Sequence, residues 1–237
     1  MILNNLLLFE HEIQSENQYL IESPERVQHI IQVLGKRVGD ELNICEVNKS
    51  LGTARIDKLT ENSVELLVQR REKGVSFDIK LFVAISRPPT MKKILEHGTS
   101  LGVSEFHFYR PELTEKSYLD AKLFKEKLFT SQIELGLSQS KVFWKLPKVI
   151  LHQELPKFDD IELGQKYLLK MQAKKKFSDF PPDLKKPISL VIGPERGLIP
   201  SENLFFEESG FTPIEVSPST LRVEIATFAA LSQLFLF

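Results

Sequence analysis

The chain has 237 residues, of which 42% are hydrophobic and 27% are charged, the balance of an ordinary globular protein. A single cysteine excludes an internal disulfide, and the five histidines show no metal-ligand spacing, so we expect no metal site. The net charge of −1 at pH 7 is not that of a protein that binds nucleic acid over its whole surface. Any contacts with nucleic acid must therefore come from local positively charged patches. No segment resembles a membrane span or a secretory signal, so we expect no membrane association and a cytoplasmic location.

The first part of the chain predicts short strands and one short helix. Ser23 followed by Pro24 is a typical helix start, and the next apolar residues fall on one helical face up to Gly35. Three β-rich runs separated by polar turns follow, Glu41–Val47, Gly52–Leu59 and Ser63–Gln69. Short strands at such spacing favour a small barrel. Residues 1–73 are therefore predicted to form a β-rich domain, which ends in the charged stretch Arg70–Ser76.

Beyond this boundary, strands and helices alternate, which predicts an α/β domain over residues 74–237. Ile79–Ile85 is almost continuously apolar, as expected of a parallel strand that is covered on both faces. Further strands are predicted at Glu105–Tyr109, Tyr167–Lys170, Ile188–Ile192 and Thr212–Val216. Helices are predicted over Met91–Thr99 and Leu119–Leu137, from a cap at Ser201 to Gly210, and from Val223 onwards.

Two loops near the C-terminus contain the candidate site. The apolar strand Ile188–Ile192 runs directly into Gly193-Pro194-Glu195-Arg196-Gly197, and ligands of open α/β sheets bind beyond the carboxyl ends of strands. The second loop, Ser217–Glu224, leads into the last helix and places Glu224 in its first turn, which the helix dipole favours. Taken singly, each loop is more typical of an ordinary turn before a helix than of a ligand site.

Together and in this order, Gly193-Pro194-Glu195-x-Gly197 and Leu221-Arg222-x-Glu224-x-Ala226 resemble the C-terminal motifs of the ribosomal RNA small subunit methyltransferase E family, within the SPOUT superfamily. Weaker agreement in His29–Leu34, Leu101-Gly102-Val103 and Gln139-Ser140 extends the resemblance over nearly the whole chain. It implies a PUA-like RNA-binding β-barrel over residues 1–73 and a SPOUT-type α/β domain with a trefoil knot over residues 74–237. It also implies a homodimer that transfers a methyl group from S-adenosylmethionine to N3 of a uridine in 16S ribosomal RNA.

The same resemblance assigns roles to individual residues. The cofactor-binding residues that it implies are Leu169, Lys170, Ile192, Gly193, Pro194, Glu195, Gly197, Val216, Ser217, Thr220 and Leu221. Arg222 is the expected catalytic cation, which would stabilise negative charge on the base. Glu224 is a candidate proton acceptor, although helix capping explains it as well. Contacts to ribosomal RNA or the small ribosomal subunit are expected from Arg37, Lys174, Lys175 and Arg196.

Some positions depart from the family pattern. The family usually has arginine where this chain has Gly35, and a second glycine where this chain has Arg196. Arginine fits there only if the backbone does not need a positive φ, and its side chain would then either contact RNA or block the cofactor site. Three alternatives stay open: an active methyltransferase, a non-catalytic dimeric RNA-binding relative, and a methyltransferase with another substrate. The apolar last helix is explained equally by a dimer contact and by core packing.

Overall fold

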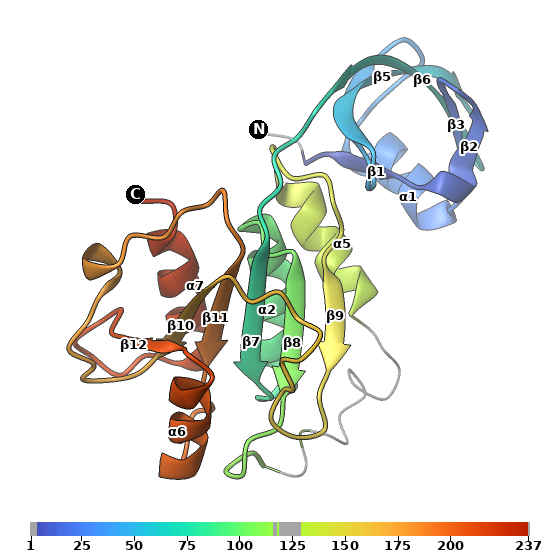
Figure 1. Cartoon of the computed structure of the whole chain (residues 1–237). Helices are drawn as coiled ribbons and strands as arrows, with labels where there is room; N and C mark the ends of the chain where they lie inside the picture. The colour runs from blue at the N-terminus through green and yellow to red at the C-terminus, as the bar shows by residue number, and fades with distance from the viewer. Residues whose placement is uncertain (1–3, 116–117, 119–128, 237) are drawn as a thin grey trace. The chain divides into compact units, whose positions relative to one another are not determined.

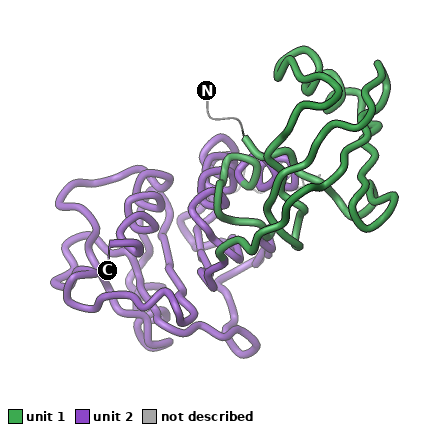
Figure 2. Tube along the Cα trace, turned by 90° about the horizontal axis from the view of Figure 1, so that it is seen from above, with its two compact units in different colours: residues 1–75, 137–146 green, residues 76–136, 147–237 purple. Residues whose placement is uncertain are grey.

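A computed structural model of the chain describes residues 4–115, 118 and 129–236. The chain divides into two compact units, residues 1–75 with 137–146 and residues 76–136 with 147–237, coloured separately in Figure 2. Residues 137–146 thus return to the first unit, although we expected all of residues 74–237 to form one domain. The return has a physical basis, since the Asn5 backbone N–H donates to Ser138 O at 2.8 Å and Leu137 packs against Leu7 and Cys45.

The first unit is built on a curved six-stranded sheet with the order β1-β4-β5-β6-β3-β2 (Figure 1). Its strands are β1 (Leu6–Leu8), β2 (Ile13–Ser15), β3 (Gln18–Ile21), β4 (Glu41–Glu46), β5 (Ser50–Leu59) and β6 (Val64–Glu72). The pairing of β1 with β4 is parallel and the others are antiparallel. The three predicted strands of this region are β4, β5 and β6. A short 3-10 turn, η1 (Glu10–Glu12), precedes β2.

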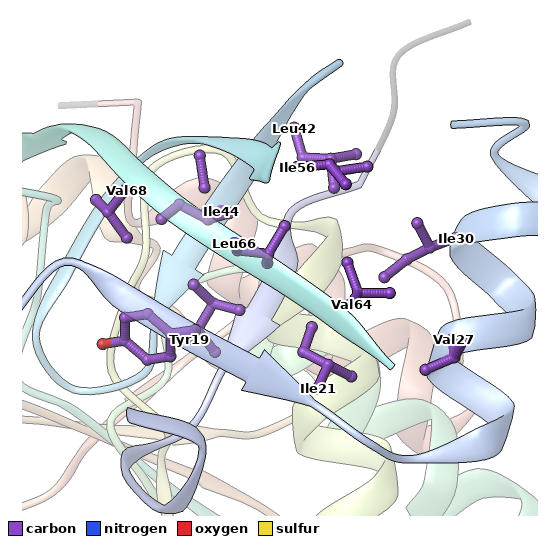
Figure 3. Packing of buried hydrophobic residues seen from close by; sticks show 12 residues of the cluster. Tyr19, Ile21, Val27, Ile30, Leu42, Ile44, Ile56, Val64, Leu66 and Val68 are labelled. Carbon is purple, nitrogen blue, oxygen red and sulfur yellow. The ribbon is translucent and has the colours of Figure 1, made fainter. Parts of the chain in front are cut away.

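The predicted helix of the first unit covers its apolar core. It consists of α1 (Pro24–Gln28), which continues as the π-helical turn η2 (His29–Val33). Val27 and Ile30 are fully buried in one cluster with Ile21 and Val64 (Figure 3). Gly35 follows the helix with a φ of +62°, a conformation that glycine adopts without strain.

The second unit is a parallel six-stranded sheet with the order β12-β10-β11-β7-β8-β9. Its strands are β7 (Ile79–Ala84), β8 (Glu105–Tyr109), β9 (Lys148–Leu151), β10 (Gln165–Leu169), β11 (Ile188–Ile192) and β12 (Thr212–Ile214). The helices in its described residues are α2 (Pro88–Ser100), α5 (Thr130–Gln139), α6 (Pro200–Glu208) and α7 (Val223–Gln233), with the 3-10 turn η3 (Phe177–Asp179). The last three residues of α5 belong to the first unit. Every residue of β7 and β11 is buried, and α2 packs against α7 (Figure 1). The predicted fold class, an α/β domain preceded by a small β-domain, is confirmed.

The start of one helix differs from the prediction, and another predicted helix lies mostly outside the described residues. The predicted cap Ser201 is wrong, because α6 begins at Pro200 and Ser201 lies inside its first turn. The Glu202 carboxylate caps this helix instead by accepting the backbone N–H of Ile199 at 3.0 Å. Gly210 follows α6 with a φ of +86°, as the prediction required. Most of the predicted helix Leu119–Leu137 falls outside the described residues, and α5 begins at Thr130.

Candidate active site

Three adjacent parallel strands, β10, β11 and β12, end beside one cavity of about 300 Å³. The loop that follows each strand lines it, and so do side chains from α6 and α7. The carboxyl ends of parallel strands are where open α/β sheets bind ligands. The volume is at the lower end of the range typical of small-molecule sites.

The cavity brings together all of the residues that we expected to bind the cofactor. They are Leu169, Lys170, Ile192, Gly193, Pro194, Glu195, Gly197, Val216, Ser217, Thr220 and Leu221. The lining also contains residues that we did not name, which are Met171, Leu198, Asn203, Ile214, Glu215, Ser219, Val223 and Ala226. Ser219 and Val223 lie within the expected loop Ser217–Glu224, and Ala226 ends the motif that begins in that loop. Asn203 comes from α6 and has no local sequence signal.

Two glycines shape the loop after β11, Gly197 through its backbone conformation and Gly193 through the space beside it. Gly197 has a φ of +76°, and its N–H donates to Pro194 O at 2.9 Å to close a tight turn. A Cβ on Gly193 would lie 3.2 Å from Leu198 Cγ, so a larger residue there would push into the wall of the cavity. Arg196 is not among the described residues with a positive φ, so arginine is accommodated at this turn position without backbone strain.

Buried polar groups fix both ends of this loop. At its start, Tyr109 Oη donates to Ile192 O at 3.0 Å, and burial together with the nearby Glu202 carboxylate raises the pKa of Tyr109. At its end, Glu202 is 5% exposed and accepts two backbone N–H groups, that of Ile199 at 3.0 Å and that of Glu112 at 2.7 Å. Glu202 therefore ties the loop after β11 to the loop after β8. Charge-assisted bonds of this kind are among the strongest in proteins.

The chemistry of the cavity suits a partly apolar ligand with a positive charge. Leu169, Ile192 and Ile214 provide apolar surface, and the carboxylates of Glu195 and Glu215 lie in the same lining. Glu215 Oε1 accepts the backbone N–H of Gln172 at 3.1 Å, which fixes that carboxylate. An adenosine group needs such apolar walls with backbone polar groups around them, and a sulfonium is favoured near carboxylates. The residues therefore fit S-adenosylmethionine.

The two expected catalytic residues lie beside the cavity and not in its lining. Arg222 is the N-cap residue of α7, between the lining residues Leu221 and Val223, and its side chain is exposed. Within the described part of the chain it has no ion pair. Glu224 lies in the first turn of α7, as predicted, but it is buried and its Oε1 lies 3.8 Å from Lys93 Nζ.

The expected RNA-binding residues are exposed and lie in both units. Arg37 belongs to the first unit, and its backbone N–H donates to Asp40 Oδ2 at 2.8 Å. Lys174 and Lys175 lie between β10 and η3, and Lys175 Nζ stands 4.7 Å from the centroid of the Phe180 ring. Arg196 lines a second pocket beside the cavity and is absent from the lining of the cavity itself.

Among the described residues, no helix is long and apolar enough to cross a membrane. The same residues contain no group of three or more His, Cys, Asp or Glu side chains positioned to hold a metal ion.

The fold and the loop-lined cavity place the chain in a class of methyltransferases. Residues 73–235 match the family described as RNA methyltransferase domain. A ribosomal RNA small subunit methyltransferase E of Treponema pallidum is 31% identical, over 95% of this chain and 88% of that protein. A ribosomal RNA small subunit methyltransferase E 1 of Borreliella burgdorferi is 33% identical, over 64% of this chain and 65% of that protein. The chain belongs to the ribosomal RNA small subunit methyltransferase E family, which confirms the resemblance found in its motifs.

A solved structure agrees at the level of the fold. The ribosomal RNA small subunit methyltransferase E of Neisseria gonorrhoeae, bound to S-adenosyl methionine, superposes with a TM-score of 0.79. It is 20% identical in sequence, and the match covers 96% of this chain and 95% of that one.

Proposed function

We propose that this chain uses S-adenosylmethionine to methylate N3 of a uridine in 16S ribosomal RNA. One observation carries the proposal: every residue expected to bind the cofactor lines a single cavity at the carboxyl ends of β10, β11 and β12. Family membership supports ribosomal RNA of the small subunit as the substrate, because the relatives' names specify it. The choice of uridine N3 rests on the motif resemblance.

The residues of the cavity account for binding and positioning. Bound S-adenosylmethionine supplies a methyl group that its positively charged sulfur already activates. The protein therefore has mainly to hold donor and acceptor in line. The loops after β10, β11 and β12 would enclose the bound donor, and the carboxylates of Glu195 and Glu215 would favour its positive charge.

Arg222 is the proposed catalytic cation. A neutral N3–H is a poor nucleophile, so negative charge develops on the base as the proton leaves, and a nearby guanidinium stabilises that charge. Arg222 supports this role because it is exposed and adjoins two lining residues. Glu224 as the proton acceptor stays a prediction with less support, since its carboxylate is buried beside Lys93.

The remaining assignments concern the whole protein. We propose that residues 1–73 form a PUA-like domain that binds RNA, with Arg37 as one contact. Lys174, Lys175 and Arg196 provide contacts from the second unit. We also propose that the protein works in the cytoplasm as a homodimer, for which Ile225 offers support because 47% of its side chain is exposed.

A strain from which the gene for this protein has been deleted tests the proposed function directly. We expect mass spectrometry of its small-subunit ribosomal RNA to show one uridine that has lost a methyl group. The wild-type gene should restore this methyl group, whereas Arg222→Ala should restore less than about 1% of it while retaining cofactor affinity. An unchanged ribosomal RNA together with cofactor binding would point to another substrate. Failure to bind the cofactor would favour the non-catalytic RNA-binding alternative.

A further inference from the structure

A second pocket of about 270 Å³ lies beside the proposed cofactor cavity. Three segments form most of its lining, residues 85–86 after β7, residues 112–115 after β8 and residues 194–196 after β11, and Tyr118 adds an aromatic side chain. Pro194 and Glu195 line both spaces, so the two share a wall. All three segments leave the carboxyl edge of the same parallel sheet, where ligands of such sheets bind.

The shared wall matters because a transferase needs two adjoining sites. Reacting atoms must approach to roughly 3–3.5 Å before the bond forms, so the acceptor has to reach the donor directly. If the first cavity holds the methyl donor, a pocket separated from it by one loop is the place for the acceptor. This inference therefore rests on the proposed function.

The lining of the second pocket favours a ligand with several hydrogen-bonding groups. Ser86, Glu112 and Thr114 contribute polar side chains to it. Thr114 is 8% exposed, and within the described residues its hydroxyl has no hydrogen-bond partner. A buried hydroxyl without a partner is uncommon and calls for a partner that a ligand can supply.

The rim of the pocket indicates a ligand attached to phosphate. Arg196 is exposed there and has no ion pair within the described part of the chain. A guanidinium binds phosphate oxygens through two parallel hydrogen bonds, which lysine cannot reproduce. Glu112 and Glu115 are also exposed and would repel phosphate, so we place the RNA backbone on the side of Arg196.

Glu195 is the carboxylate common to both spaces. Its Oε1 lies 3.3 Å from Arg87 Nε, an ion pair that holds the side chain on the shared wall. Glu195 therefore borders the proposed acceptor site as well as the proposed donor site. Glu224, in contrast, lines neither space.

We propose that the second pocket receives the unpaired RNA base that becomes methylated, and that Glu195 accepts the proton of its ring nitrogen. Glu195 takes that proton, the electron pair left on the nitrogen forms the bond to the methyl carbon, and the electron pair of the broken carbon–sulfur bond stays on sulfur. The base enters the pocket after leaving its stack, because enzymes that modify bases act on extruded or single-stranded nucleotides. Thr114 holds the base, and Arg196 holds the adjoining phosphate.

The isosteric variant Glu195→Gln tests the proton acceptor. With small ribosomal subunits from the deletion strain, we expect its single-turnover rate at saturating cofactor to fall about 100-fold. The remaining rate should rise more steeply with pH than that of the wild type, since hydroxide then has to remove the proton. An active wild type with an unchanged rate and pH profile in Glu195→Gln would overturn the role of Glu195.

Thr114→Val and Arg196→Ala test the pocket itself through RNA binding without cofactor. We expect each to weaken equilibrium binding of the ribosomal subunit about five- to tenfold while cofactor affinity in calorimetry stays within about twofold. Thr99→Val is the control for Thr114→Val, because Thr99 is a buried threonine of α2. Lys148→Ala is the control for Arg196→Ala, because Lys148 is an exposed cation of β9 in the same unit. Neither control residue lines the pocket, and neither variant should change RNA binding.

The outcomes separate the two proposals. A wild-type protein that binds no cofactor and transfers no methyl group contradicts the proposed function, whatever the variants do. An active wild type whose Thr114→Val and Arg196→Ala variants bind RNA like the controls contradicts the acceptor pocket alone. If Glu195→Gln loses cofactor binding, Thr114→Val and Arg196→Ala still decide on the pocket, because neither residue lines the cofactor cavity.

Discussion

Gly197 is a single residue on which the shape of the cavity depends. Its φ of +76° is costly for a residue with a Cβ, although a Cβ there would meet no other atom within 4 Å. We expect Gly197→Ala to strain the loop by about 1–2 kcal/mol and to weaken S-adenosylmethionine binding roughly 5- to 30-fold. Gly197→Asn should lose less, because asparagine tolerates this conformation. Calorimetric titration gives both affinities.

Gly35→Ala is the matched control for this prediction. Gly35 has a φ of +62° and equally open surroundings, but it lies in the first unit. Its substitution should therefore leave cofactor affinity unchanged. Equal losses of cofactor affinity in Gly35→Ala and Gly197→Ala would contradict the explanation that Gly197→Ala acts by straining the loop after β11.

The buried His107 and the half-buried His152 make the second unit sensitive to acid. His107 Nε2 lies 3.1 Å from Glu105 Oε2, and its Nδ1 lies 3.0 Å from His152 Nε2. A carboxylate only accepts, so His107 donates to Glu105 through Nε2 and, being neutral, accepts from His152 through Nδ1. Burial is the main cause that lowers the pKa of both histidines, and for His107 the Glu105 carboxylate opposes it in part.

This pair predicts a loss of stability on acidification. Between the lowered pKa values of the folded state and the ordinary value near 6.5, only the unfolded chain binds these protons, so the free energy of unfolding falls as the pH drops below about 7. His152→Phe should reduce this pH dependence, measured by urea unfolding at pH 7.5 and 5.5. His11→Asn is the control, since His11 is exposed in the first unit. If the free energy of unfolding depended on pH to the same extent in both variants and in the wild type, the attribution of this dependence to His107 and His152 would be contradicted.

At the scale of elements, a buried carboxylate on β4 joins three strands of the first unit. Glu46 is 1% exposed, accepts from Tyr19 Oη at 2.7 Å on β3 and from Arg71 Nε at 2.7 Å on β6, and also bonds Ser50 on β5. Burial alone would raise the pKa of Glu46, but the bonds from Arg71, Ser50 and Tyr19 outweigh it and lower the pKa to about 2. The stability gained from this carboxylate is therefore present above its ordinary pKa and is lost only as the pH falls toward 2.

Arg71→Ala should destabilise the first unit, because it leaves the buried Glu46 carboxylate with only the half-exposed Lys49 ammonium, 3.3 Å from its Oε1, as a counter-charge. We expect a loss of about 2–4 kcal/mol in the free energy of unfolding. Arg70→Ala is the adjacent control, since the exposed pair of Arg70 and Glu72 is worth less than about 1 kcal/mol. The fluorescence of Trp144, the chain's single tryptophan, reports on this unit. Equal losses in the two variants would contradict the role of Glu46.

The elements that could be predicted from the sequence are those with a strong burial pattern. β7 and β11 are apolar at almost every position because both faces of the sheet are covered. β1, β2, β3 and β9 were missed, since they are only three or four residues long and every residue of β2 is exposed. Their pairing depends on distant partners, such as β1 with β4, which no local pattern records.

In the candidate site, too, the residues with a local sequence pattern could be predicted and those without one could not. The loops after β11 and β12 could be found because glycine, proline and polar residues follow apolar strands there. Tyr109 and Glu202 could not be found, because they act on backbone atoms far away in the chain, Ile192 O and the N–H of Glu112. Arg196 was ambiguous until its position in the second pocket was known.

At the scale of the whole molecule, exposed apolar residues near the C-terminus support a dimer. Ile225 is 47% exposed and Phe235 is 37% exposed, so burial against a second chain would remove apolar surface from water. Ile225→Asp should shift the protein from dimer to monomer at micromolar concentration in light scattering. Leu204→Asp on α6, which is 54% exposed, is the control and should remain dimeric. A monomeric wild type would contradict the homodimer.

Calorimetric titration of the purified wild-type protein with S-adenosylmethionine tests the central claim most directly, namely that the loops after β10, β11 and β12 form its binding site. We predict saturable binding of one cofactor per chain, weakened by Gly197→Ala and unaffected by Gly35→Ala. A folded protein that takes up no cofactor at millimolar concentration, or one whose affinity is indifferent to Gly197, would contradict it.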